Sequence, residues 1–208
     1  MWPWEHAIVG YLAYSLFRHA VYRESPKGLE AFAVVFASVL PDLIDKPLAW
    51  EYDVFGSGYA LGHSILFAVP LSLAGGLLAR RVGRPRAGIA FGVGYLLHLP
   101  SDVLDSYARN GVVQFGLMLW PIETSRASSH GQGFTAYFMQ LFEGYRSDLL
   151  AGDLSTYLRI QLGLVLFAFV LWLYDGAPVL RECLLGTRRV LVDLRERVFE
   201  PSEDTSKR

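Results

Sequence analysis

The chain has 208 residues, of which 52% are hydrophobic and 19% are charged, and its formal net charge is −1. Because no basic tract is interleaved with aromatic residues, the composition argues against a nucleic-acid partner. A single cysteine, Cys183, excludes an internal disulfide and any zinc site of the CxxC type. The length allows one domain or a closely packed pair of domains.

Apolar segments that are expected to form helices follow one another along the chain. They are residues 5–17, 29–44, 60–79, 87–104 and 157–174. The last has about the length needed to cross a bilayer, and Trp172 near its end suits an interfacial aromatic belt. The first two are shorter and could instead be buried helices of a soluble bundle. We expect an all-α fold, a polytopic membrane helical bundle of about five spans.

The long connection at 106–156 contains a further predicted helix. Residues 134–150 have the spacing of an amphipathic helix that lies on the membrane surface. His130 precedes this helix in a turn-rich stretch, and a role in binding substrate or metal stays open for it. We expect residues 1–178 to form the membrane-embedded domain and residues 179–208 a cytoplasmic, basic, amphipathic tail with a disordered end.

Connections that are rich in basic residues alternate along the chain with connections that have few. The rich ones carry Arg18, Arg23 and Lys27, then Arg80, Arg81, Arg84 and Arg86, and finally, in the tail, Arg181, Arg188, Arg189, Arg195, Arg197, Lys207 and Arg208. Antiparallel spans predict such alternation, and the positive-inside rule places the rich connections in the cytoplasm. We therefore expect a multi-pass protein of the plasma or inner membrane with its N-terminus outside and its C-terminus in the cytoplasm.

Ionisable side chains lie inside or beside the most apolar segments, where they are costly without a partner. They are His6, Asp42, Asp45, His63, His98, Asp102 and Asp105. The predicted topology brings all of them to the outer face, with His63 opening the third helix, although none was used to count basic charge. This convergence predicts one shared polar site.

The spacing of these residues suits a metal. His98 and Asp102 are four residues apart and share a helix face, unless Pro100 bends or restarts the helix. Asp42 and Asp45 offer two carboxylates in the same way, although Asp45 could instead pair with Lys46. Imidazole with carboxylate favours zinc, manganese or iron over calcium. We expect one or two divalent ions, zinc first, with His6 and His63 completing the ligand set.

Four short segments and their order resemble a known family. LPDLID (40–45), GHS (62–64), HLPSDVLDS (98–106) and MLWP (118–121), after an N-terminal helix with a histidine, resemble membrane-bound metal-dependent hydrolases once grouped as a domain of unknown function. A more distant similarity is to zinc-dependent phospholipase C. The resemblance covers roughly residues 1–125. It implies a metal site at His6, Asp42, Asp45, His63, His98 and Asp102. The chain departs from the pattern at Lys46 and in the residues before His63.

Three functions fit these observations. The first is hydrolysis of an ester or phosphoester in a lipid-like substrate, with Asp45 bridging metals or acting as general base and the helix at 134–150 guiding substrate. The second is ion or proton transport, which the absence of charged residues within 64–79 and 87–97 disfavours. The third is a membrane scaffold that binds a partner through its tail and retains a degenerate metal site.

Overall fold

The computed structural model describes residues 1–124, 133–152 and 155–199, and all regular structure within them is helical. The elements are α1 (Pro3–Tyr22), α2 (Gly28–Trp50), α3 (Ile65–Arg81), α4 (Pro85–Asn110), the 3-10 helix η1 (Phe115–Met118), α5 (Phe134–Ala151), α6 (Thr156–Tyr174) and α7 (Leu180–Phe199). The expected all-α fold is confirmed. His130 and the tail end 200–208 lie outside the described residues.

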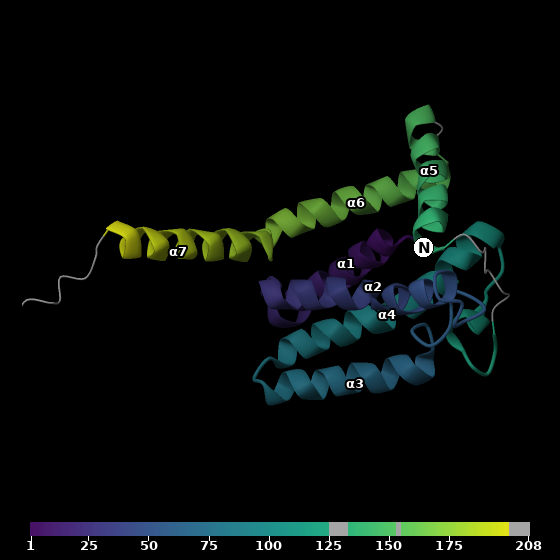
Figure 1. Ribbon diagram of the computed structural model, residues 1–208, viewed down its shortest axis with the longest axis horizontal. Helices are drawn as coiled ribbons and strands as arrows, with labels where there is room; N and C mark the ends of the chain where they lie inside the picture. Colours follow the sequence, from purple (N-terminus) through teal and green to yellow (C-terminus); the bar gives the residue numbers. More distant parts are fainter. Residues whose placement is uncertain (125–132, 153–154, 200–208) are drawn as a thin grey trace, which may run out of the picture.

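Helices α1 to α4 form an antiparallel bundle (Figure 1). Helix α4 is central, because it packs against α1, α2 and α3, and its closest association is with α2. Helix α6 runs beside α1, α5 stands steeply across one end of the bundle, and α7 extends away from the other end (Figure 1). The ends of α1, α2 and α4 that carry the predicted site residues therefore share one end of the bundle.

Small residues set the closest helix contacts. A Cβ atom at Gly94 of α4 would overlap the carbonyl oxygen of Val34 in α2, and one at Gly10 of α1 would overlap the Ser38 hydroxyl. Only glycine allows the backbones to approach this closely, as in many membrane helix pairs. Ser38 of α2 is consequently held between α1 and α4, directly beside the candidate site.

The interior of the bundle is partly polar and its surface is apolar. Arg18 and Glu30 are buried, whereas Phe32, Leu73 and Phe167 are at least 50% exposed. Among the described residues, α4 and α6 are long and apolar enough to cross a membrane, and α1, α2 and α3 do not meet both conditions. The expectation of five spans is thus supported for residues 87–104 and 157–174 alone.

Two local expectations are corrected and one is confirmed. His63 does not open the third helix, because α3 begins at Ile65 and His63 lies in the preceding connection. Helix α4 continues through Pro100 without restarting, so His98 and Asp102 do lie on one buried face. Arg18 is not a connection residue: it lies in α1 and is fully buried, 2.9 Å from Glu24 and 3.1 Å from Glu30.

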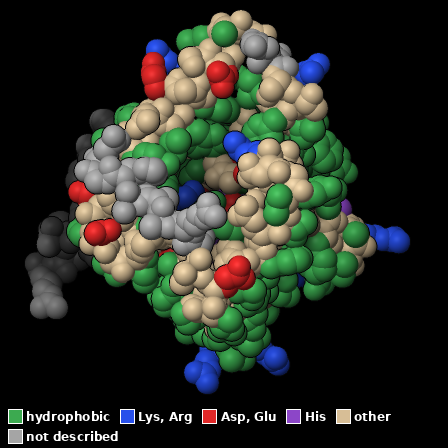
Figure 2. Space-filling model, turned by 90° about the vertical axis from the view of Figure 1, so that its right-hand side faces the viewer, with side chains coloured by type: hydrophobic (Ala, Val, Ile, Leu, Met, Phe, Trp, Pro, Cys, Tyr) green, Lys and Arg blue, Asp and Glu red, His purple; other side chains and the backbone are tan. Residues whose placement is uncertain are grey.

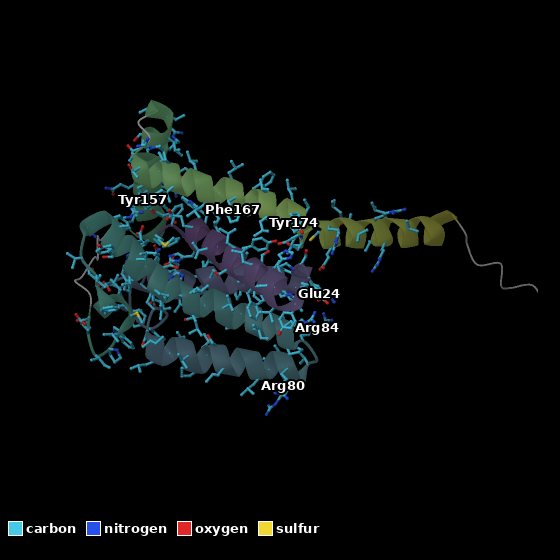
Figure 3. All side chains as sticks on the ribbon, turned by 180° about the vertical axis from the view of Figure 1, so that it is seen from behind. Glu24, Arg80, Arg84, Tyr157, Phe167 and Tyr174 are labelled. Carbon is cyan, nitrogen blue, oxygen red and sulfur yellow. The ribbon has the colours of Figure 1, made fainter. Side chains whose placement is uncertain are left out.

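The two ends of the bundle differ in charge. Glu24, Arg80 and Arg84 lie at one end, where α6 finishes at Tyr174, whereas Tyr157 at the start of α6 lies at the other (Figure 3). The basic connections that were expected in the cytoplasm therefore share the end opposite to the histidines and aspartates of the candidate site.

Candidate metal centre

Five of the six predicted ligands meet in one buried cluster. His6 comes from the first turns of α1, Asp42 from the last part of α2, His63 from the connection before α3, and His98 and Asp102 from the last part of α4. Each is at most 4% exposed. Their ligand atoms form two overlapping groups, His6 with His98 and Asp102, and Asp42 with His63 and His98, in each of which all atoms lie within 4.8 Å of one another.

His98 lies at the centre of this cluster. Its Nε2 is 3.1 Å from His63 Nε2, 3.2 Å from Asp102 Oδ2 and 3.8 Å from Asp42 Oδ1. His63 Nε2 is 3.4 Å from Asp42 Oδ1 and 3.4 Å from Asp102 Oδ2. His6 Nε2 is 3.2 Å from Asp102 Oδ1, and its ring stacks on that of His98 with centroids 3.6 Å apart. Residues that the sequence separates widely thus aim their donor atoms at one small volume.

The other ring nitrogens fix which atoms carry protons. His98 Nδ1 lies 2.6 Å from the carbonyl oxygen of Ser38, which can only accept, so this nitrogen donates. His63 Nδ1 lies 2.7 Å from Asp45 Oδ2 and donates to that carboxylate. In the neutral rings both Nε2 atoms therefore present lone pairs to each other and to two carboxylates. A cation relieves this repulsion, and outer hydrogen bonds of this kind orient metal-ligating histidines.

Asp45 has contacts unlike those of the other aspartates. Its carboxylate accepts hydrogen bonds from the backbone N–H groups of Ala60, Gly62 and His63 at 2.8, 2.8 and 3.0 Å, in addition to His63 Nδ1. These bonds engage both oxygens and hold the backbone of residues 60–63 out of a helical conformation. Asp45 lies outside both groups of candidate ligand atoms and positions His63.

The site has an excess of negative charge. Burial by itself lowers the pKa of His63, but the adjacent carboxylates of Asp102, Asp42 and Asp45 outweigh burial and raise the pKa to about 10. Burial and then the charges of Asp102 and Asp42 raise the pKa of Tyr59 well above its usual value. The carboxylates that contribute to both shifts create a negative potential, which favours any bound cation.

Several buried atoms of the cluster lack hydrogen-bond partners among the described residues. They include both ring nitrogens of His6, Asp42 Oδ1 and Asp102 Oδ2. Leaving a buried polar atom unpaired costs about 1–3 kcal/mol, so a group of them needs an explanation. Three imidazoles and two carboxylates are the donor set that zinc and similar ions prefer, so the residues fit a divalent transition metal.

A cavity of about 430 Å³ connects the cluster to the surface. Its lining includes the buried Asp42 and Asp102 of the cluster, the side chains of Tyr59, Lys46 and Arg109, and aromatic side chains such as Phe138 of α5. Figure 2 shows the hollow at the end of the bundle, with acidic and basic side chains within it. The cluster is therefore buried but accessible.

Sequence reasoning considered Asp45 as the partner of Lys46 and gave Arg109 no role in this cavity. Lys46 Nζ lies 2.7 Å from Asp42 Oδ2, and Arg109 Nε lies 3.0 Å from Asp105 Oδ2. Each pair is spaced four residues apart on a helix, a pattern that was readable in the sequence. The Met1 amino group lies 3.0 Å from Asp105 Oδ2 and 3.1 Å from Asp102 Oδ1. Asp105 thus forms ion pairs at the rim of the cavity.

A comparison with protein families matches residues 1–179 to the family described as YdjM inner membrane protein. The chain belongs to this family. The match spans α1 to α6 and hence the whole candidate centre. Association with the lipid bilayer, expected from the apolar segments, follows from this membership. The chain matches no curated protein and no solved structure, so the expected similarity to hydrolases and to zinc-dependent phospholipase C gains no support.

Proposed function

We propose that this inner membrane protein is a metal-dependent hydrolase whose cation is held by His6, Asp42, His63, His98 and Asp102. One observation carries the proposal. The Nε2 atoms of His63 and His98 lie 3.1 Å apart beside two carboxylates, while both Nδ1 atoms donate elsewhere. A proton on one imidazole ring would relieve the repulsion in one of these close contacts, whereas a metal cation would relieve it in all of them.

The arrangement favours one ion over two. Both candidate groups use His98, and the Nδ1 of His98 is engaged with Ser38, so its Nε2 alone can ligate. Two ions would have to share this single nitrogen, which has one lone pair. Of the expected one or two metals we therefore propose one, and zinc suits the mixed nitrogen and oxygen donors.

The side chains of such a site have different roles. A bound divalent ion would act as a Lewis acid and would lower the pKa of a coordinated water toward about 7. Asp45, expected as a bridging ligand or general base, instead keeps His63 in the required tautomer. Asp42 and Asp102 are both buried at the inner end of the cavity and carry the negative charge that retains the ion.

The bilayer setting suggests where substrate enters. We propose that α1, α2 and α3 cross the membrane together with α4 and α6, that the basic connections face the cytoplasm, and that the site opens at the outer rim. Leu43, Phe134 and Leu141 line the cavity, so its outer part is apolar. A lipid-like ester or phosphoester can enter this cavity from the leaflet, with α5 as a guide.

The packing disfavours the transport alternative. A continuous ion path needs polar groups through the depth of the bundle. Between the centre and the buried pair Arg18–Glu30 lies an apolar core formed by Tyr11, Tyr14, Ala31, Val34 and Ala90. The ionisable groups are thus separated into two clusters at opposite ends.

Elemental analysis of the detergent-purified protein tests the proposal. We expect about one zinc or other transition-metal ion per chain, lost in His98→Ala and Asp102→Ala because each removes a ligand. His19→Gln, a histidine change at the opposite end of α1, should keep the metal. At a free metal concentration about 100 times Kd, the ion should stabilise the protein by about 2.7 kcal/mol, seen as a lower unfolding temperature after chelation. Wild-type protein without bound metal would contradict the proposal.

A further inference from the structure

The cavity above the metal centre has two chemically different parts. One part of its lining is basic, with Lys46 from α2 and Arg109 from α4, and another is aromatic, with Trp2, Trp50 and Phe138. A site for a neutral ester has no need of two cations. We propose, on the basis of the proposed hydrolase function, that the substrate is a phosphate ester of a lipid alcohol, with Lys46 and Arg109 binding its phosphate.

The charge of the cavity supports an anionic ligand. Three carboxylates, of Asp42, Asp102 and Asp105, line it together with three cationic groups, Lys46, Arg109 and the Met1 amino group, so their formal charges cancel. A divalent ion gives the cavity two positive charges. The metal-loaded cavity therefore attracts an anion more strongly than the metal-free cavity does.

Both cations keep hydrogen-bonding capacity for a ligand. Lys46 Nζ has three N–H donors, and its ion pair with Asp42 Oδ2 at 2.7 Å accounts for one. Arg109 directs Nε to Asp105 at 3.0 Å and Nη2 to the Tyr157 hydroxyl at 2.6 Å, which leaves Nη1 outside these contacts. When a metal ion binds to Asp42, the ion pair between that carboxylate and Lys46 weakens. A phosphate offers the oxygens that the remaining donors need.

The aromatic wall supplies the site for the lipid part. Trp2 packs edge-on against Phe138 at 6.0 Å, and Trp50 stacks on Phe134 at 5.9 Å. The phenylalanine stack continues along α5 from Phe134 through Phe138 to Phe142, with centroids 6.2 and 6.3 Å apart. This apolar strip leads from the cavity along α5 to Phe142, which packs edge-on against Trp4 of α1. A phosphate in the cavity thus places its hydrocarbon chain along α5.

The reaction that follows is hydrolysis at phosphorus. The oxygen of water bonds to phosphorus, the bond between phosphorus and the oxygen of the lipid alcohol breaks, and the alcohol leaves with a proton from water. The products are the free alcohol and a phosphate that carries the oxygen of water in place of the alcohol oxygen. No oxidant, reductant or further co-substrate enters this balance.

Equilibrium binding to the zinc-loaded protein tests the proposal. The probes are dihexanoyl phosphatidate, dihexanoylglycerol and inorganic phosphate, measured through tryptophan fluorescence because Trp2 and Trp50 line the cavity. We expect phosphatidate to bind at least about tenfold more tightly than either of the others, since only it uses both parts of the cavity. Lys46→Gln and Arg109→Gln should each weaken phosphatidate binding about tenfold, and the double variant more, with the zinc content unchanged.

The controls separate this proposal from the metal proposal. Arg80→Gln, at the exposed opposite end of the bundle, should bind phosphatidate as the wild type does. Equal binding of dihexanoylglycerol, equally tight binding of inorganic phosphate, or unchanged affinity in the double variant would each overturn the inference while zinc remains bound. Phosphatidate binding that is just as tight without zinc would also overturn it. Absence of zinc from the wild type would instead contradict the proposed function.

Discussion

At the scale of single residues, three buried aspartates of similar surroundings have different roles. Asp42 and Asp102 direct carboxylate oxygens at imidazole Nε2 atoms. Both oxygens of Asp45 instead accept hydrogen bonds, from three backbone N–H groups and from His63 Nδ1. The difference arises because the connection before α3 folds back over the end of α2. Asp45 therefore acts on a metal through His63, by fixing the tautomer and direction of its ring.

Asp45→Asn tests this role. The amide keeps the shape of the carboxylate but removes its charge, so the hydrogen bond from His63 Nδ1 weakens and metal affinity should fall about 10–100-fold. A competition titration of zinc against a chelating dye measures the change. Asp53→Asn, an exposed aspartate in the same connection, should leave the affinity unchanged. Equal zinc affinity in Asp45→Asn and wild type would assign Asp45 a purely structural role.

At the scale of elements, the contact between α2 and α4 positions the centre. Gly94 allows α4 to approach the backbone of α2 at Val34, one turn from Ser38, and Ser38 in turn accepts the hydrogen bond from His98 Nδ1. The same contact places Asp42 of α2 opposite His98 and Asp102 of α4. Helix spacing and ligand geometry are therefore set together.

Two alanine substitutions in α4 separate packing from helix propensity. In Gly94→Ala the new methyl group collides with the Val34 carbonyl oxygen, and we expect a loss of about 1–3 kcal/mol in stability. In Gly92→Ala the nearest atom is 3.9 Å away, so the helix should gain up to about 1 kcal/mol. Thermal unfolding in detergent, followed by circular dichroism, compares the two. Equal unfolding midpoints would show that the helices separate more easily than the close contact indicates.

At the scale of the whole molecule, the basic connections and the candidate metal centre lie at opposite ends of the bundle. The buried Arg18 of α1 forms ion pairs at the basic end with Glu30 of α2, also buried, and with Glu24, exposed in the connection. The Gly28 N–H donates to Glu182 of α7 there at 2.8 Å. The candidate centre occupies the other end, beneath α5. The orientation that we propose, with the basic connections in the cytoplasm, would direct the cavity to the outer side.

Accessibility of single cysteines tests this orientation. Cys183 of α7 is exposed and is the natural cysteine of the chain, so a membrane-impermeant maleimide added to intact spheroplasts should leave it unlabelled until the membrane is opened. Val54→Cys in a Cys183→Ser background should be labelled at once, because Val54 is exposed in the connection beside the site. The reverse labelling pattern would place the metal centre in the cytoplasm.

The amino-acid sequence by itself determined the helical class, the limits of the helix ending at Tyr174, and the set of residues that gather around His98. These follow from local properties: apolar length, the cost of charge in apolar segments, and helical spacing. The position of Arg18 was mistaken because nothing in its neighbourhood shows that Glu30 of the next helix neutralises it. The sequence also predicts Asp45 as a metal ligand because a carboxylate at that spacing is chemically competent, and this role stays a prediction.

Only the tertiary structure decided which of the chemically suitable side chains lie close together. The fold-back at Gly62 gives Asp45 its backbone partners, and the approach of α2 to α4 at Gly94 brings Ser38 to His98. Lys46 and Arg109 reach one cavity for the same reason. Hydrogen bonds and ligand sets depend on distances of a few ångströms between helices, and no local pattern in the chain encodes them.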